Sequence, residues 1–551
     1  MRLLASFCFA APTPVLAKWL DFLPQQPLSN PHDTHQPFTK DLDTFINATM
    51  TEFLTPGMSI AIVNANTTSA KGYGYANLAT QEPMTPRTLF LAGSTTKSFT
   101  ATAISQLVYS NASDYADIDW TTKLVALLRE DFVLQDEYAT NHISLIDALS
   151  HRTGMPRHDT SWVNQPGPVD LKERVRQLRY LPLHRELREA WEYCNLMFHV
   201  VAHALETVTR SSMTELLRNR IWKPLGMLET FFDLTDALAY AESSDEVTMA
   251  TGYLYDNLTS HSYVAVPWSD LPPADGAGGV VSNVQDYTRW IQTFLNPFNT
   301  SSPVSAEAIE MMTSAHMPRP ATISPYAGGK AWYGLGLEGG VYKDVEVIGH
   351  GGAINGYMTA MYWIPEREFG VVIMQNTYSL APNVVLWKII DDFLETAEAE
   401  RYDMAGAARK MQAEKLAEMD QARNRLYPER GDLDPALPLP EYEGRYTHPA
   451  YHNFTISRTT DSSPQDGDGL GASPRLQVTP SVGAYGNISA TMHHVSGEHW
   501  LTVTSMGPAG SWLTDEAVKA RFEVGVKGKV TGLWLQVEPA IPDMALLERV
   551  A

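Results

Sequence analysis

Three short segments, far apart in the chain, contain the residue types that serine acyl transfer requires. They read GSTTK at residues 93–97, YCN at residues 193–195 and HGG at residues 350–352. Together they offer a hydroxyl nucleophile, two groups that can carry protons, and backbone that a substrate can approach closely. Their combination predicts an enzyme that forms a covalent acyl intermediate on a serine.

The first segment supplies a nucleophile and a base. Ser94 opens a stretch with helical spacing, residues 94–108, and Lys97 lies one turn further along the same face. A serine hydroxyl becomes a good nucleophile only when a base takes its proton. Lysine can be that base where burial and nearby positive potential lower its pKa, and a helix N-terminus contributes such a potential.

The second segment adds a proton carrier and an amide. Tyr193 and Asn195 come just before an apolar helical run, residues 196–205. A tyrosine held beside a lysine ammonium can become phenolate-like and carry protons to and from a leaving group. Asn195, with a donor and an acceptor, can orient Lys97 and a substrate carbonyl.

The third segment predicts a substrate-binding strand edge. His350 follows a strand-like run, residues 345–348, and is followed by two glycines. Glycine lets another backbone approach closely, so Gly352 favours pairing of a substrate with this edge. The backbone N–H of Ala353 can then complete an oxyanion hole with that of Ser94. The alternative for His350 is an ordinary strand histidine.

The elements around these segments predict one sheet built from both ends of a domain. Residues 58–63 and 71–76 read as neighbouring strands, and residues 358–364 and 369–374 flank a turn that predicts a hairpin. Helical stretches occupy most of the sequence between the two pairs.

Composition divides the chain further. We expect a signal peptide at 1–17, an N-terminal arm at 18–37, a catalytic domain at 38–395, a helical linker at 396–437 and a β domain at 438–551. Residues 393–425 are rich in Ala, Glu, Lys, Arg, Met and Gln and predict a charged connecting helix. Short Val, Thr and Tyr runs after residue 441 predict the small all-β domain.

The charge of the chain narrows the choice of partners. Its 551 residues carry a formal net charge of −22, which argues against nucleic acid and anionic membranes. We expect no integral membrane segment, because the apolar run at the start is too short to cross a bilayer. The expected partner is a small-molecule ester, amide or peptide substrate, and oligomerisation through the C-terminal domain stays open.

The first residues favour the secretory route. One positive charge is followed by a short apolar run and by small residues around Ala17 that a signal peptidase could cut. Seven Asn-x-Ser/Thr sequons are glycosylation candidates; they begin at Asn47, Asn66, Asn111, Asn257, Asn299, Asn453 and Asn487. We therefore expect a secreted or secretory-pathway protein, the alternative being a cytosolic protein with an apolar start.

The three segments resemble the motifs of the class C β-lactamase and penicillin-binding-protein superfamily of serine hydrolases. The matching pairs, in order, are Ser94/Lys97, Tyr193/Asn195 and His350/Gly352. Further support comes from residues 88–93, 143–156, 224–227 and 278–282, and the resemblance covers about residues 40–395. It implies an α+β fold in which an antiparallel sheet is flanked by helices and joined by an all-helical region. Residues 442–446 resemble the lipocalin-like, barrel-like domain that some members append.

One departure from the family pattern bears on the substrate. Many relatives carry Lys-Thr-Gly at the third motif, where a permanent positive charge helps to anchor the carboxylate of a β-lactam or a peptide terminus. His350 is largely neutral at pH 7 unless its surroundings raise its pKa. His-x-Gly occurs in relatives resembling D-aminopeptidases, esterases and fungal-type acyltransferases, so we do not expect efficient β-lactam hydrolysis.

The resulting expectation is a secreted serine hydrolase, esterase or D-amino-acid peptidase-like, that forms an acyl-enzyme on an ester or amide. Ser94 attacks, Lys97 accepts its proton and Tyr193 protonates the leaving group. The Ser94 and Ala353 amides hold the oxyanion, while Asn195 and His350 position the substrate. Two alternatives stay open: an acyltransferase that passes the acyl group to a small-molecule metabolite, and a non-catalytic binding protein on the same fold.

No metal and no organic cofactor is expected. His199 and His203 lie one helical turn apart, which is zinc-ligand spacing, but the glutamate of a zinc protease is missing. Cys194 stands between two candidate site residues, and packing is its better interpretation because this position is often small in the family.

Overall fold

The structure, a computed structural model, describes residues 37–164, 170–256, 260–268, 275–320, 325–354, 356–459, 474–480, 488–506 and 515–550. The chain divides into two units, Met1–Pro37 and Phe38–Ala551, and every element below belongs to the second. The predicted signal peptide, almost all of the predicted arm and the sequons at Asn257 and Asn487 lie outside the described residues, so these stay predictions.

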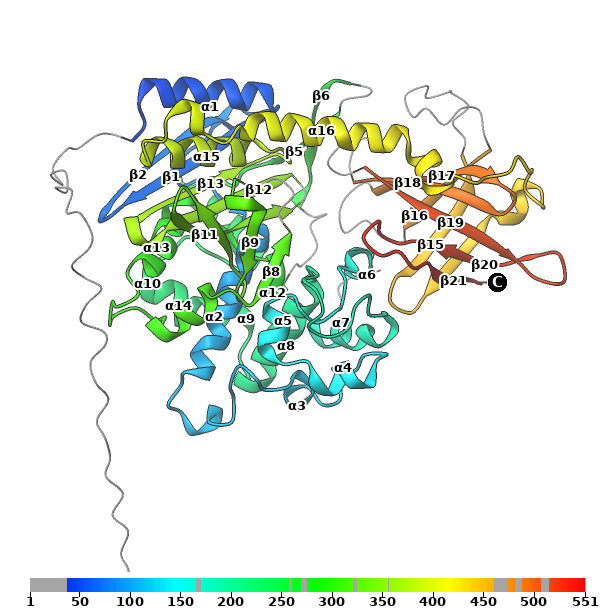
Figure 1. Ribbon diagram of the computed structural model, residues 1–551, viewed down its shortest axis with the longest axis horizontal. Coiled ribbons are helices and arrows are strands. Elements are labelled where there is room, and N and C mark those ends of the chain that lie inside the picture. Colours follow the sequence, from blue (N-terminus) through cyan, green and yellow to red (C-terminus); the bar gives the residue numbers. More distant parts are fainter. Residues whose placement is uncertain are drawn as a thin grey trace, which may run out of the picture. The chain divides into compact units, whose positions relative to one another are not determined.

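A nine-stranded antiparallel sheet forms the centre of the catalytic region (Figure 1). Its order is β3-β2-β1-β13-β12-β11-β10-β9-β8. The strands are β1 (Gly57–Asn64), β2 (Thr67–Asn77), β3 (Glu82–Pro83), β8 (Met317–Pro320), β9 (Lys330–Tyr333), β10 (Glu338–Tyr342), β11 (Val345–Ile354), β12 (Tyr357–Ile364) and β13 (Phe369–Gln375). Strands from the start of the domain therefore pair with strands from its end, as the sequence predicts, and β12 and β13 form the predicted hairpin.

The central strands are buried on both faces. In β1, Ile60 and Ile62 belong to one apolar core while Ala61 and Val63 belong to another, because successive strand residues point to opposite faces. Helices α1 (Lys40–Glu52) and α15 (Ala381–Phe393) cover the first face. Helix α13 (Val284–Leu295) packs against the second. Continuous apolar runs, rather than alternating ones, are what such a three-layer arrangement requires.

A helical region lies between the two halves of the sheet in sequence and carries most of the site. Its helices are α2 (Thr96–Val108), α3 (Leu124–Leu127), α4 (Glu137–His142), α5 (Leu145–Leu149), α6 (Asp159–Val163), α7 (Leu171–Gln177), α8 (Asn195–Thr209), α9 (Met213–Leu217), α10 (Lys223–Leu225), α11 (Leu234–Glu242), α12 (Asp275–Gly278) and α14 (Ala306–Thr313). Two short ladders accompany them: β4 (Phe90–Leu91) pairs with β7 (Val281–Ser282), and β5 (Gly252–Asp256) with β6 (Ser262–Val266). The predicted α+β fold, a sheet flanked by helices beside a helical region, is confirmed.

The predicted C-terminal β region is a closed barrel. Its eight strands pair in sequence order, and the last pairs back with the first. They are β14 (Gly444–His448), β15 (His452–Arg458), β16 (Arg475–Pro480), β17 (Ile488–Ser496), β18 (His499–Met506), β19 (Glu516–Val524), β20 (Val530–Leu535) and β21 (Ala545–Val550). Closure leaves no unpaired edge strand.

The segment at residues 393–425, which joins the catalytic region to the barrel, differs from the single connecting helix that its composition predicts. Helix α15 ends at Phe393, and Glu395 adopts the left-handed conformation that closes a helix. A new helix, α16 (Met404–Asp420), begins where the Asp403 side chain accepts a hydrogen bond of 2.7 Å from the Gly406 amide. A short α17 (Ala422–Leu426) follows it.

The barrel contacts the catalytic region next to the predicted site. The Tyr451 hydroxyl lies 2.6 Å from Nδ1 of His158, and the Tyr451 carbonyl accepts a hydrogen bond of 2.7 Å from the Asn164 side chain. The Thr160 amide donates to the Glu538 carboxyl at 2.8 Å. These contacts all involve residues 158–164, in and around helix α6, so the barrel is joined to the segment that follows the predicted motif at 143–156.

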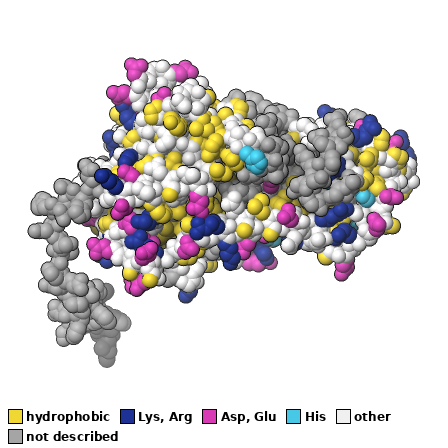
Figure 2. Space-filling view, turned by 90° about the horizontal axis from the view of Figure 1, so that it is seen from above, with side chains coloured by type: hydrophobic (Ala, Val, Ile, Leu, Met, Phe, Trp, Pro, Cys, Tyr) yellow, Lys and Arg dark blue, Asp and Glu magenta, His cyan; other side chains and the backbone are white. Residues whose placement is uncertain are grey.

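The surface agrees with an acidic protein of mixed charge. On the face shown in Figure 2, acidic and basic side chains are interspersed over the described residues. Among the described helices, none combines the length and the apolar character needed to cross a membrane.

Candidate active site

Ser94 lies in a tight turn beside strand β11. Gly93–Thr95 form a single 3-10 turn, and the α-helix begins at Thr96, two residues later than the spacing predicts. Gly93 has a φ of +56°, and a Cβ on it would lie 2.8 Å from the Ala353 amide nitrogen. A Cβ on Gly352 would lie 2.1 Å from the Ala92 carbonyl oxygen. Only glycine permits this close approach of turn and strand, which brings Ser94 and Ala353 together.

Lys97 is fully buried and points at the serine. Its Nζ lies 3.1 Å from the Ser94 Oγ, 2.8 Å from the Asn195 Oδ1 and 2.8 Å from the Ala277 carbonyl oxygen. Burial, reinforced by the Arg157 guanidinium, holds the pKa of Lys97 well below its usual range. A neutral amine has two protons, and the two carbonyl oxygens can only accept them. In the neutral form, which the lowered pKa favours, the amine lone pair therefore faces the serine hydroxyl.

Tyr193 lies against the same amine. Lys97 Nζ is 4.7 Å from the centroid of its ring, and the Tyr193 hydroxyl is hydrogen-bonded with Ser94. Burial raises the pKa of Tyr193, and hydrogen bonding with Ser94 and the charge of Arg157 offset this only in part, so the phenol is favoured in this state over the phenolate-like form that a charged Lys97 would promote. The expectation assumed a charged Lys97 beside the phenol, whereas burial disfavours the charged form of both groups. Tyr193 is thus a phenol that has a proton to donate.

Asn195 is the first residue of helix α8 and links Lys97 to a carboxylate. Its Nδ2 donates to Asp159 Oδ1 at 3.0 Å, which turns Oδ1 of Asn195 toward Lys97. Asp159 also accepts a hydrogen bond of 2.7 Å from the Arg157 guanidinium. Sequence reasoning missed Arg157 and Asp159, although the family-like segment at 143–156 ends directly before them.

Arg157 is the permanent positive charge nearest Tyr193 among the described residues. Its guanidinium carbon lies 5.1 Å from the centroid of the Tyr193 ring. The side chain is 45% accessible because it faces open cavity space, so its influence on neighbouring groups is partly screened. Its charge nevertheless acts to lower the pKa of both Lys97 and Tyr193.

His350 is buried in β11 and both of its ring nitrogens are engaged. Nε2 lies 2.9 Å from the Tyr333 hydroxyl, and Nδ1 contacts the Gly351 carbonyl oxygen. A carbonyl can only accept, so Nδ1 carries the proton and Nε2 accepts from Tyr333. Burial lowers the pKa of His350 to about 4, so the ring is neutral at pH 7. It offers no charge to a substrate carboxylate.

His151 is a second residue that the sequence did not single out. It is completely buried, and its Nδ1 accepts a hydrogen bond of 3.1 Å from the Cys194 amide. Its ring centroid lies 4.3 Å from that of Tyr193 and 4.8 Å from that of Tyr333. His151 therefore holds the second motif in place from behind and packs between the two tyrosines.

These side chains surround a cavity of about 660 Å³. Ser94, Tyr193, His350, Gly352 and Ala353 all line it. Much of the remaining wall is aromatic, from Trp191, Tyr326, Tyr362 and Trp387. Of the seven predicted catalytic and substrate-binding residues, five reach the cavity and the other two, Lys97 and Asn195, lie buried behind Ser94 and Tyr193.

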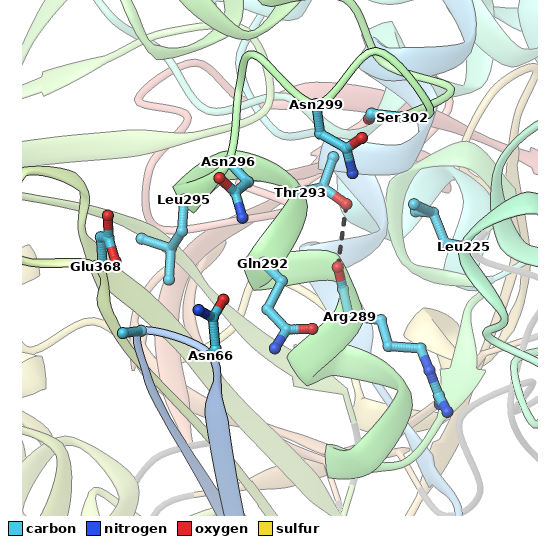
Figure 3. A pocket seen from close by; sticks show the side chains of 11 residues that line it. Asn66, Leu225, Arg289, Gln292, Thr293, Leu295, Asn296, Asn299, Ser302 and Glu368 are labelled. Atoms are coloured by element: carbon cyan, nitrogen blue, oxygen red, sulfur yellow. Dashed lines mark hydrogen bonds between the residues drawn. The ribbon is translucent and has the colours of Figure 1, made fainter. Parts of the chain in front are cut away.

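A cavity of about 370 Å³ elsewhere on the catalytic region contains none of these residues. Figure 3 shows its lining from helix α13, the following segment and the turn between β1 and β2. It includes the glycosylation candidates Asn66 and Asn299, both exposed. Its amide-rich lining offers no nucleophile with an adjacent base, so it has no counterpart of the Ser94 arrangement.

Cys194, His199 and His203, for which the sequence favours packing over chemistry, are each in contact with neighbouring protein groups. Cys194 is buried, which raises the pKa of its thiol to about 12, so the thiolate is scarce at neutral pH. His203 Nε2 lies 3.0 Å from Asp131 Oδ2, and His199 lies beside Arg174 and Trp162. No cluster of three or more His, Cys, Asp or Glu side chains that could hold a metal ion occurs among the described residues.

The sheet, the helical region and the Ser94–Lys97–Tyr193 arrangement define a serine enzyme of the acyl-transfer type. The chain belongs to the β-lactamase family, whose model matches residues 42–394. This confirms the resemblance carried by the three motifs. A second model, described as a domain of unknown function (DUF3471), matches residues 430–547, which cover the barrel as far as the middle of its last strand, β21.

Two relatives are named as hydrolases. The chain is 36% identical over 440 residues to the unguisins hydrolase ungD' of Aspergillus campestris, covering 78% of this chain and 79% of the relative. It is 32% identical over 533 residues to the unguisins hydrolase ungD of Aspergillus violaceofuscus, covering 93% and 90%. Protein flp of Staphylococcus aureus is 25% identical over 62% of this chain and 63% of its own length.

Solved structures share the fold. An octameric penicillin-binding protein homologue from Pyrococcus abyssi matches with a TM-score of 0.56 and 21% identity, covering 92% of this chain and 99% of its own. A D-amino acid amidase from Ochrobactrum anthropi matches with a TM-score of 0.51 and 23% identity, covering 64% and 98%. The longer of these matches extends beyond the catalytic region into the barrel.

Proposed function

We propose that this chain hydrolyses an amide or ester bond of a peptide-like small molecule through an acyl-enzyme on Ser94. The observation that carries the proposal is the hydrogen-bond arrangement of Lys97. A buried amine that donates to two carbonyl oxygens and faces a serine hydroxyl is a base ready to accept that proton.

In the acylation step, Ser94 Oγ attacks the substrate carbonyl carbon and its proton passes to Lys97. The carbonyl oxygen becomes an oxyanion held by the Ser94 and Ala353 backbone N–H groups. Tyr193 then donates its phenolic proton to the leaving nitrogen or oxygen as the bond to the carbonyl carbon breaks. The lysine ammonium returns a proton to Tyr193, so both groups regain their starting forms.

Deacylation uses the same groups in reverse. A water molecule attacks the ester carbonyl of the acyl-enzyme while the Tyr193 and Lys97 pair accepts its proton. The oxyanion forms again between the two amides, and Ser94 leaves with the proton that the pair returns. The products are a carboxylic acid and the free enzyme. An added amine or alcohol in place of water would give the acyl-transfer product.

The proposed substrate is a neutral, peptide-like compound. A neutral His350 with both nitrogens engaged offers no anchor for a free carboxylate, and the aromatic wall of the cavity suits apolar side chains. The name of the D-amino acid amidase supports an amide substrate, and the names of the two unguisins hydrolases point to unguisins as candidates. Unguisins are therefore the first compounds to test.

We also propose that the protein follows the secretory route. Four of the five sequons in the described residues, at Asn47, Asn66, Asn111 and Asn299, have exposed asparagines that a glycosyltransferase could reach. Expression in a eukaryotic secretion host, followed by endoglycosidase treatment and mass measurement, tests this. A secreted product that loses mass on treatment is expected, and retention of an uncleaved, unglycosylated chain would contradict it.

The test of the proposed function uses wild-type protein and Ser94→Ala in parallel. Both are incubated with a fluorophosphonate, and then with a panel of activated esters, D-amino-acid amides, unguisins and β-lactams. We expect a covalent adduct on Ser94 and turnover of esters or amides, both absent in Ser94→Ala, with β-lactams the poorest class. Turnover that survives in Ser94→Ala would overturn the proposal. An excess of acyl transfer over hydrolysis with added amines would indicate a transferase instead.

A further inference from the structure

The barrel encloses a second cavity of about 430 Å³ that no step above uses. Strands β15 to β20 supply most of its wall, and residues 536–540, after β20, supply one side. The segment from Arg157 to Asn164 closes it from the catalytic region. This barrel cavity lies within the range of about 300–1,000 Å³ typical of small-molecule sites.

The barrel cavity adjoins the active-site cavity. Three residues line both: Arg157, Tyr378 and Ala540. Arg157 also lies over the ring of Tyr193, the residue that protonates the leaving group in the proposed reaction. The barrel cavity therefore begins on the side of Ser94 toward which the leaving group departs.

The walls of the barrel cavity combine apolar side chains with a few polar groups. Phe454, Val478, Val518 and Leu535 provide apolar surface from four different strands. Thr502 is 2% exposed and lines the cavity, and its Oγ1 has no hydrogen-bond partner among the described residues. A buried hydroxyl without a partner is costly, whereas a ligand amide would supply the missing hydrogen bond.

Two carboxyl groups in the wall are suited to uncharged ligands. Burial raises the pKa of Glu538 to about 8 and also raises the pKa of Glu516. A carboxylic acid can both donate and accept a hydrogen bond, as an amide of a peptide backbone requires. The Glu538 carboxyl already accepts a hydrogen bond from the Thr160 amide, which fixes its position in the wall of the barrel cavity.

We propose that the barrel cavity is a second substrate subsite, which holds an apolar, amide-containing segment on the leaving-group side of the reacting bond. It rests on the proposed function, since it assumes that Ser94 is acylated and that Tyr193 faces the leaving group. The barrel then contributes directly to substrate choice, selecting compounds whose leaving portion is long, uncharged and apolar.

The test compares two acetate esters that give the same acetyl-enzyme. One is O-acetyl-lactamide, whose leaving alcohol is short, and the other is the O-acetyl ester of lactoyl-valyl-leucinamide, whose leaving alcohol carries an apolar dipeptide. We expect kcat/KM to be about tenfold or more higher for the extended ester, the factor that burial of one such side chain supplies. Equal kcat/KM values for the two esters would overturn the subsite.

A pair of neighbouring substitutions sharpens the comparison. Ala490 lines the barrel cavity from β17, whereas Thr491 is the next residue on the same strand and points to the other face. Ala490→Phe fills the cavity and should abolish the preference for the extended ester, leaving the short ester unaffected. Thr491→Phe adds similar bulk outside the cavity and should keep the preference. Loss of preference in both variants, or in neither, contradicts the proposal.

A third variant remains informative if Ala490→Phe does not fold. Thr502→Val keeps the shape of the side chain and removes the hydroxyl that has no partner. We expect the preference for the extended ester to fall about fivefold, as for one lost hydrogen bond, with an unchanged or higher melting temperature. An unchanged preference would count against the subsite. Absence of Ser94 acetylation by either ester would instead overturn the proposed function, and the subsite with it.

Discussion

The two walls that flank Ser94 differ in where they hold charge. On one side, Arg157 and Asp159 form an ion pair that touches Tyr193 and Asn195. On the other side, His350 is neutral, and both of its ring nitrogens are hydrogen-bonded within the protein, to Tyr333 and to the Gly351 carbonyl. The charges on this side, Arg319 and Glu338, form an ion pair of 3.1 Å and so balance each other. The charged wall reaches the proton-transfer groups, whereas the neutral wall faces the strand on which a substrate would lie.

This difference separates two tasks that a single positive charge beside Ser94 could perform. A cation at the third motif both favours the deprotonated forms of nearby bases and anchors a substrate carboxylate. Here Arg157 can perform the first task from the helical region, while nothing at His350 performs the second. Chemistry at Ser94 is thus retained without selection for a free carboxylate, and four substitutions test this division.

The largest effect is expected for Lys97→Met, which removes the base and keeps an unbranched side chain in the same space. We expect kcat/KM for an activated ester to fall about 10⁴-fold, near the upper limit for loss of a general base. Circular dichroism and the melting temperature serve as the control for folding. A fall of less than tenfold would show that another group takes the Ser94 proton.

Tyr193→Phe is expected to come next. The variant keeps the ring against Lys97 and Arg157 but has no proton to give, so loss of the general acid should cost about 10²–10³-fold in kcat. The deficit should be larger for amides than for p-nitrophenyl esters, because a nitrophenolate leaves without protonation. Equal deficits for both classes of substrate would contradict the role of Tyr193 as the acid.

Arg157→Gln tests the charged wall itself. Removing the guanidinium raises the pKa of Lys97, so less of the free amine is present at neutral pH and the acid limb of the pH–rate profile moves to higher pH. We expect a fall in kcat/KM of about tenfold or less, because the side chain is partly exposed to solvent. Arg157→Lys keeps the charge and should behave more like the wild type; identical pH profiles for all three proteins would contradict the argument.

The smallest effect is expected on the neutral wall. His350→Gln should change kcat/KM for neutral esters by about fivefold or less, the cost of a repacked hydrogen bond. Since burial lowers the pKa of His350 to about 4, its ionisation should leave no limb between about pH 5 and 8 in the wild-type profile. A loss of several hundredfold in His350→Gln would make His350 part of the proton-transfer machinery.

The sequence predicted those parts of the site that depend on local spacing. Ser94 and Lys97 are three residues apart on one turn, so their contact follows from helix geometry. The hairpin of β12 and β13 likewise follows from two apolar runs around a short turn. The resemblance to the family, rather than local spacing, assigned Tyr193 and His350 to the second and third motifs of the site.

The features of the site and the fold that the sequence did not predict depend on packing between distant segments. Arg157 reaches Tyr193 only because the segment after residue 156 folds back over helix α8, and no periodic pattern marks it. The ionisation of Tyr193 depends on burial, which the sequence does not reveal. Closure of the barrel depends on β14 pairing with β21, about a hundred residues away, and the shared wall of the two cavities depends on that closure.

The most direct test of the central claim is the pH dependence of Ser94 labelling by a fluorophosphonate, measured as a rate constant by intact mass. If a buried Lys97 of lowered pKa takes the serine proton, the rate rises with pH and reaches its plateau well below the ordinary pKa of lysine. If the rate instead climbs steadily toward about pH 10.4, the ordinary pKa of lysine, Lys97 is charged at neutral pH and the account is wrong.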